Sequence, residues 1–155
     1  MFDLKIGFSI PGIIIFILPM IINIVYFILP PVNAPVEAAD VHSWIEMVEQ
    51  ATRILYAIAI VFLVSRKPIE VKSVWLILAV VFLVLYYIVW IRYFMGGRDI
   101  ALLGKSFLFV PMPLAVFPVL YFICAALWLH NGVAAIVMVI FGIAHNIVSY
   151  RSFSK

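Results

Sequence analysis

The fold is decided by residues 41–64, which read VHSWIEMVEQATRILYAIAIVFLV. The uninterrupted apolar run at the end of this stretch, Ile54 to Val64, has only eleven residues. A helix that crosses a bilayer core of about 30 Å needs roughly 20 predominantly apolar residues. A membrane span here must therefore reach back through three charged residues, Glu46, Glu49 and Arg53. Charges inside a membrane are costly, and by default they mark a functional site or an internal ion pair.

The composition of the whole chain shows why a membrane span is expected. Hydrophobic residues make up 68% of the 155 residues and charged residues 11%, with a mean hydropathy of +1.28. A water-soluble domain cannot hide so much apolar surface, so lipid must surround most side chains. Continuous rather than alternating apolar runs favour helices over a closed barrel. We therefore predict one all-α integral membrane domain over residues 1–155.

Five apolar segments follow one another along the chain. The expected transmembrane helices cover residues 6–29, 41–64, 73–95, 107–129 and 133–150. Prolines lie inside the first span at Pro19 and inside the fourth at Pro111, Pro113 and Pro118. Each proline lacks a backbone N–H, so it interrupts the helical hydrogen bonds and frees a carbonyl upstream. The sequence predicts a bundle of about five transmembrane helices with proline-broken first and fourth spans.

The alternation of five spans gives the molecule two ends. We call side A the end with the N-terminus, the loop at Arg66 and the turn at His130, and side B the end with the loops at Pro35 and Arg98 and the C-terminus. The charged stretch of the second span falls in the side B half. The positive-inside rule places the more basic loops in the cytoplasm, but here basic residues divide almost evenly between the two sides. The most concentrated cluster, Arg66, Lys67 and Lys72, lies on side A. We therefore expect a protein of the cell membrane with side A in the cytoplasm and side B facing outward.

The charged stretch has helical spacing. His42, Glu46, Glu49 and Arg53 are separated by four, three and four residues, which places them on one face of a helix. Tyr56 extends this face by one turn. Glu49 and Arg53 stand at i and i+4, where opposite charges can pair.

The fifth span brings two more polar side chains to the same half of the membrane, His145 and Asn146. Three interpretations of the polar face follow. It is an ion-paired surface packed against neighbouring helices, a cavity open to side B that holds a polar head or an ion, or a solvated stretch in the interface. We take the second as the functional prediction. The predicted ligand-binding residues are His42, Glu46, Glu49, Arg53, Tyr56, His145 and Asn146.

A metal site is the narrower alternative for these residues. His42, Glu46 and Glu49, with His145 from a facing helix, would supply mixed nitrogen and oxygen ligands. The positive charge of Arg53 one turn away opposes a bound cation. We therefore expect no metal and no cofactor.

Three classes of function remain for a chain of this kind. The first binds or translocates a small amphipathic or lipophilic ligand through a polar pocket in one leaflet. The second is an accessory or immunity-type membrane subunit that acts through helix–helix contacts. The third is an intramembrane enzyme in which buried glutamate and histidine serve as acid and base. The expected partners are membrane lipid, the ligand, and either a second copy or a partner membrane protein. Nucleic acid is not expected, because no basic stripe with interleaved polar residues is present.

Overall fold

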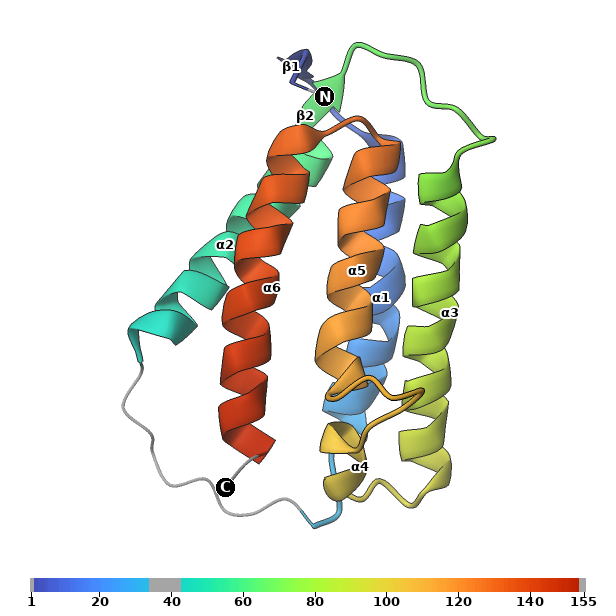
Figure 1. Cartoon of the computed structure of the whole chain (residues 1–155), viewed down its shortest axis with the longest axis vertical. Coiled ribbons are helices and arrows are strands. Elements are labelled where there is room, and N and C mark those ends of the chain that lie inside the picture. The colour runs from blue at the N-terminus through green and yellow to red at the C-terminus, as the bar shows by residue number, and fades with distance from the viewer. Residues whose placement is uncertain (1, 34–42, 154–155) are drawn as a thin grey trace.

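The computed structural model describes residues 2–33 and 43–153, and this part of the chain is predominantly helical. The long helices run alternately up and down in Figure 1. They are α1 (Ile10–Ile28), α2 (Trp44–Phe62), α3 (Val74–Met95), α5 (Pro113–Trp128) and α6 (Gly132–Phe153). The remaining elements are two short strands, β1 (Leu4–Ile6) and β2 (Leu63–Ser65), and the short helix α4 (Ala101–Gly104).

Three of the described helices are long and apolar enough to cross a membrane. They are α1, α3 and the stretch Gly132–Ser152 of α6. The prediction of a helical, multi-pass membrane protein is confirmed at this level. Helices α2 and α5 each lack one of these two properties. Helix α2 is long enough but carries three charged residues, and α5 is apolar but has only 16 residues.

The fourth apolar segment differs most from the expected helix bounds. A helix was expected over 107–129, but α5 begins only at Pro113. Phe107 and Val110 exchange two backbone hydrogen bonds, of 3.1 and 2.9 Å, around Leu108 and Phe109. These two central residues have φ angles of 48° and 63°, which lie outside the right-handed helical region. A tight turn therefore occupies the place of the expected first helical turns.

Pro19 lies inside α1, and the helix continues on both sides of it. Because proline has no N–H, the carbonyl of Ile15, four residues earlier, loses its usual helical donor. The hydroxyl of Tyr121 on α5 donates to that carbonyl at 2.9 Å. In α5 the corresponding internal proline is Pro118. A neighbouring helix thus satisfies the backbone acceptor that Pro19 leaves free, as burial in lipid requires.

Two helix pairs build the bundle. Helix α2 packs along α6, and α3 packs along α5. Helix α5 also packs along α6 and joins the two pairs, while α1 lies behind α5 in Figure 1. The N-terminal end of α2 leans away from α1, α3 and α5 in the same view. The side B end of α2 therefore lies farther from these three helices than its side A end does.

The side A end is tied together by backbone hydrogen bonds. Strand β1 pairs antiparallel with β2, with Lys5 opposite Val64. Beyond the strands, the N–H of Ser9 donates to the carbonyl of Val61 at 2.8 Å. Gly12 then lies so close to the backbone of α2 that a Cβ atom at this position would collide with the carbonyl of Ile60. The first helix can approach the second here only because residue 12 has no side chain.

Asn131, in the turn between α5 and α6, ties a further helix to this end. Its side-chain amide donates to the carbonyls of Ala59 and Leu63, both at 2.8 Å, and its oxygen accepts from the N–H of Ala134 at 3.0 Å. Only 1% of the residue is exposed. We call the contacts of residues 4–12, 59–65 and 131 the side A clamp.

On side B, Arg92 near the end of α3 holds the following loop. Its guanidinium donates to the carbonyls of Leu102, Lys105 and Ser106 at 3.2, 2.7 and 3.0 Å. These bonds draw α4 and the chain that leads to α5 against the end of α3. The guanidinium of Arg92 therefore stabilises the loop between α3 and α5.

The same loop is joined to the end of α1 through Asn33. The Asn33 amide donates to the Asp99 carboxylate at 2.9 Å, and its oxygen accepts from the N–H of Ile100 at 2.9 Å. The N–H of Ala101 is a second donor to Asp99, also at 2.9 Å. The Asn33 amide and the Ala101 N–H together hold the pKa of Asp99 below its usual value.

Candidate functional site

The carboxylate of Glu49 joins α2 to α6. Its side chain is only 6% exposed, and Oε1 lies 2.6 Å from Nη2 of Arg53 and 3.0 Å from Nδ1 of His145. The predicted ion pair between Glu49 and Arg53 is thus confirmed, and His145 is a third member of the cluster. Because an ionised carboxylate can only accept hydrogen bonds, we assign the Nδ1 proton of His145 to this contact. Nε2 of His145 is then available to another partner.

Arg53 covers this buried carboxylate from outside. Its guanidinium lies over the ring of Phe141, 5.6 Å from the ring centroid. The same ring stacks on the imidazole of His145 at 5.0 Å with an interplanar angle of 16°. The Arg53 side chain is itself 48% exposed. The cluster therefore presents a guanidinium and an imidazole outward and keeps the carboxylate behind them.

The start of α2 accounts for Glu46. The helix begins at Trp44, three residues later than expected, with Ser43 as its N-cap. The Glu46 carboxylate accepts a hydrogen bond from the N–H of Ser43 at 3.3 Å, as the glutamate of a capping box does. His42, the first predicted residue of the stripe, lies outside the described residues. Glu46 thus stabilises the beginning of the helix, and it is not one of the residues around the cavity described next.

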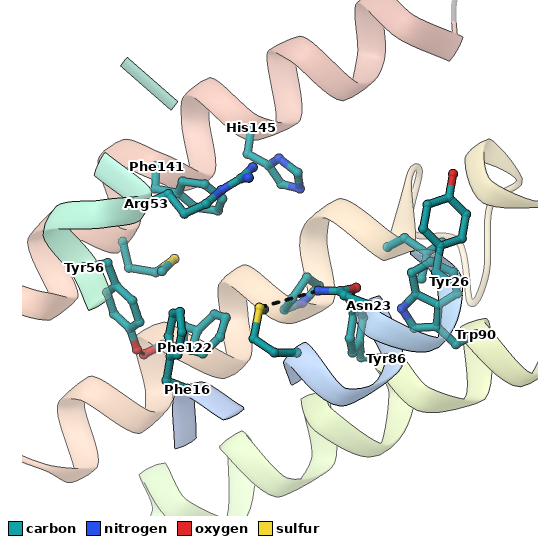
Figure 2. A pocket seen from close by; sticks show the side chains of 14 residues that line it. Phe16, Asn23, Tyr26, Arg53, Tyr56, Tyr86, Trp90, Phe122, Phe141 and His145 are labelled. Atoms are coloured by element: carbon teal, nitrogen blue, oxygen red, sulfur yellow. Dashed lines mark hydrogen bonds between the residues drawn. The ribbon is translucent and has the colours of Figure 1, made fainter. Parts of the chain in front are cut away.

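A cavity of about 300 Å³ lies between the two helix pairs (Figure 2). This volume is at the lower end of the range of about 300–1,000 Å³ that is typical of small-molecule sites. All five long helices contribute to its walls. The lining residues are Phe16, Met20, Asn23, Tyr26, Arg53, Tyr56, Tyr86, Trp90, Leu114, Pro118, Phe122, Met138, Phe141 and His145.

The two walls of the cavity differ in their polar groups. Figure 2 shows Arg53 and His145 on one side of the open space and Asn23 and Trp90 on the other. The oxygen of Asn23 accepts from the hydroxyl of Tyr86 at 2.7 Å. Trp90 is 5% exposed, and its indole Nε1 has no hydrogen-bond partner within residues 2–33 and 43–153. Polar groups from four helices thus face one apolar space.

Aromatic and sulfur-containing side chains close the cavity toward the middle of the bundle. The hydroxyl of Tyr56 donates to the carbonyl of Phe122 at 3.1 Å, and the two rings meet edge to face at 5.1 Å. Phe16 packs on Phe122 at 6.3 Å between ring centroids. These contacts leave the deep end of the cavity apolar, because the Tyr56 hydroxyl is already used.

The structure brings together some of the predicted site residues and not others. Arg53, Tyr56 and His145 line the cavity, and Glu49 lies directly behind Arg53. Asn146 instead donates to the carbonyl of Gly142 in its own helix at 2.8 Å, and it does not line the cavity. The predicted face of α2 thus supplies two residues to the cavity lining, and α6 supplies one of its two predicted polar residues.

The opposite wall was missed by sequence reasoning. Asn23 could have been found, because it is an isolated amide within an otherwise apolar span. Tyr26, Tyr86 and Trp90 gave no comparable signal. Aromatic residues near the ends of membrane spans are usually interface residues, and only the packing of α1 against α3 shows otherwise.

No group of three or more His, Cys, Asp or Glu side chains able to hold a metal ion occurs in the part of the chain that the structure describes. Comparison of the chain with protein-family models, curated protein sequences and solved structures found no match. The functional argument therefore rests on the cavity itself.

Proposed function

We propose that the protein binds or translocates a small amphipathic or lipophilic ligand through the cavity between its helix pairs. The observation that carries this proposal is an open space of about 300 Å³ with aromatic and aliphatic walls and polar groups in its side B half. A space of this kind suits a molecule with a polar head and an apolar body, because each end then meets matching surroundings.

The proposal includes five membrane spans in a cell membrane, with side B outward. The charge of α2 is compatible with this, because Glu49 is paired with both Arg53 and His145. Helix α5 is short for a bilayer core, and a short span can be accommodated by local thinning of the bilayer. Pro19 and Pro118 would mark the proline-broken spans, with the acceptor freed by Pro19 satisfied inside the bundle.

Cysteine accessibility labelling tests the five spans. Single cysteines at Asn33 and Gly97 should react from one side of the membrane, and a cysteine at Lys67 from the other. The native Cys124 is buried and provides a low background. Labelling of positions 33 and 67 from the same side would remove α2 as a span and contradict the proposal.

Mass spectrometry under native conditions tests the ligand. The full chain, extracted in mild detergent, should carry a noncovalent adduct. Leu114→Trp should reduce the adduct, because Leu114 lines the cavity and a larger ring would fill it. Leu120→Trp, on the same helix but not in the lining, is the matched control. Equal adducts on wild type and both variants would place any ligand outside the cavity, and no adduct on wild type would argue against binding.

The contact between Glu49 and His145 favours enzyme activity as a second candidate. A carboxylate that holds one imidazole nitrogen leaves the other able to take a proton, as in many acid–base sites. No Ser, Thr or Cys side chain is among the described residues that line the cavity, so water would be the nucleophile. A change in the mass of the recovered ligand on incubation, abolished by His145→Ala, would support catalysis. An unchanged ligand would support binding alone.

A further inference from the structure

The charge that a bound molecule meets in the cavity is positive. Arg53 is the one Asp, Glu, Lys or Arg side chain among the described residues that line the cavity, and 48% of it is exposed. Glu49 is only 6% exposed and is not part of the lining. Although the two side chains neutralise each other overall, the guanidinium lies between the carboxylate and the open space. A ligand head in this position contacts the cation and not the anion.

The facing wall offers hydrogen-bond donors. The indole N–H of Trp90 is buried beside the hydroxyl of Tyr86 and makes no well-aligned hydrogen bond in the described part of the chain, and Figure 2 shows its nitrogen on the side of the ring toward Asn23. The Asn23 oxygen accepts from the hydroxyl of Tyr86, whereas the Asn23 NH₂ group donates to the Met20 sulfur at 3.9 Å. A thioether is only a weak acceptor. This wall therefore holds two N–H donors without a strong, well-aligned acceptor, and the Trp90 N–H must turn out of its buried position to reach a bound head.

Neither wall presents an anion to the open space, because the Glu49 carboxylate lies outside the lining and Asn23 and Trp90 have no charged acceptor. Buried donors normally have partners in native structures, so an exception calls for an explanation such as a ligand. Carboxylate and phosphate oxygens accept strongly from guanidinium and N–H donors. A cationic head would instead face the guanidinium of Arg53, and the acceptor that the same wall offers, Nε2 of His145, carries no negative charge.

We propose, on the basis of the function proposed above, that the ligand is a single-chain amphiphile with an anionic head, either a carboxylate or a phosphate monoester. The head lies between Arg53 and the N–H groups of Trp90 and Asn23, and the chain extends along Phe16 and Phe122 toward the middle of the bundle. A volume of about 300 Å³ leaves room for one chain.

Probes with the same chain and different heads test this inference. The purified full chain in a neutral maltoside detergent is titrated with dodecanoate, dodecyl phosphate, dodecanol and dodecyltrimethylammonium, and binding is measured by native mass spectrometry. Acetate and inorganic phosphate provide the anion without a chain. We expect both anionic amphiphiles to bind about tenfold or more tightly than dodecanol, the ratio expected when one charge-assisted hydrogen bond is gained. Acetate and phosphate should not bind measurably.

Variants connect the preference to the named residues. Trp90→Phe removes the N–H and keeps a ring, so it should lower the ratio of dodecanoate to dodecanol affinity several-fold. Trp75→Phe, in the same helix but outside the lining, should leave the ratio unchanged. The double change Glu49→Gln with Arg53→Gln removes both charges together, which avoids a lone buried carboxylate, and should abolish most of the preference.

Each contrary outcome has a distinct meaning. Equal or tighter binding of dodecanol or of the trimethylammonium probe would overturn the anionic head and leave the proposed ligand binding intact. Acetate or phosphate that binds as tightly as dodecanoate would overturn the amphiphile and indicate a small-anion site. Failure of all four amphiphiles to bind would contradict the proposed function itself.

Discussion

The side A clamp and the cavity in the side B half use polar groups in opposite ways. In the side A clamp, the amide of Asn131 has acceptors and a donor at 2.8 to 3.0 Å, and β1 pairs with β2. In the side B half, the Trp90 indole has no partner in the described chain, and Arg53 is half exposed beside a cavity. Polar groups that are fully bonded stabilise a fold, whereas unbonded ones can serve a ligand. We therefore expect changes in the side A clamp to affect mainly stability, and changes around the cavity to affect mainly the proposed binding.

The largest effect is expected from Asn131→Ala. This change removes three buried hydrogen bonds and leaves the carbonyls of Ala59 and Leu63 with one donor fewer, so we expect the free energy of unfolding to fall by about 3 kcal/mol. Unfolding in mixed micelles would measure it. The control is Asn146→Ala, which removes a single bond within α6 and should cost under about 1 kcal/mol. Equal losses of stability in the Asn131→Ala and Asn146→Ala proteins would show that the clamp does not contribute more than an ordinary helix hydrogen bond.

A second, smaller loss is expected from Gly12→Ala. The added methyl group meets the backbone carbonyl of Ile60, which cannot rotate away, so α1 must shift; overpacking of this kind costs about 2 kcal/mol. Gly7→Ala is the control in the same clamp. Its Cβ would lie 3.3 Å from a methyl group of Val64, and that side chain can move. A Gly12→Ala protein as stable as the Gly7→Ala protein would show that the close approach is not important.

Arg53→Ala tests the side B half, where we expect a loss of about 1 kcal/mol. The buried carboxylate of Glu49 would keep only His145 as a partner, but the exposure of Arg53 limits what the pair contributes. Combining Glu49→Gln with Arg53→Gln should restore part of the stability, because no lone charge is then buried. Thermal unfolding in detergent would measure each variant. Independent, additive losses from the single glutamine changes would mean that the two side chains do not interact.

The smallest effect concerns Asp99 and depends on pH. Its pKa is lower in the folded chain than its ordinary value of 3.8, because Asn33 and the N–H of Ala101 donate to the ionised form. The stabilisation is therefore complete well above pH 3.8 and is lost as the pH falls through the lower, folded pKa. The melting temperature of the wild type should exceed that of Asp99→Asn at pH 6, and the difference should shrink below pH 3.8. A difference that stays constant with pH would exclude this origin.

The sequence predicted the features that depend on local spacing. The helical class follows from continuous apolar runs, and the pairing of Glu49 with Arg53 follows from a separation of four residues. The acceptor freed by Pro19 was also foreseeable, although its donor, Tyr121, is more than a hundred residues away. The local sequence thus shows that a backbone carbonyl needs a hydrogen-bond donor, but it does not show which distant residue supplies that donor.

The missed features depend on contacts between distant residues. Whether Trp90 belongs to the interface or to a cavity depends on how α1 and α3 pack, and its position near a span end suits both. The turn from Phe107 to Val110 was missed for another reason. Apolar residues in left-handed conformations are rare, so the apolar run was interpreted as helix.

The close approach of Gly12 to Ile60 also has a mechanical consequence. Helix α2 is fixed against α1 near Ile60, and its first turns lean away from α1, α3 and α5 while Glu49 joins it to α6, so it resembles a lever with its pivot near Ile60. The 16 residues from Ile60 back to Trp44 span about 24 Å, and a tilt of about 5° around that pivot would move the far end by about 2 Å. A change in the angle at the pivot would thus move Arg53 relative to the opposite wall of the cavity. We therefore expect changes at Gly12, which is not in the lining, to alter the space left for the proposed ligand.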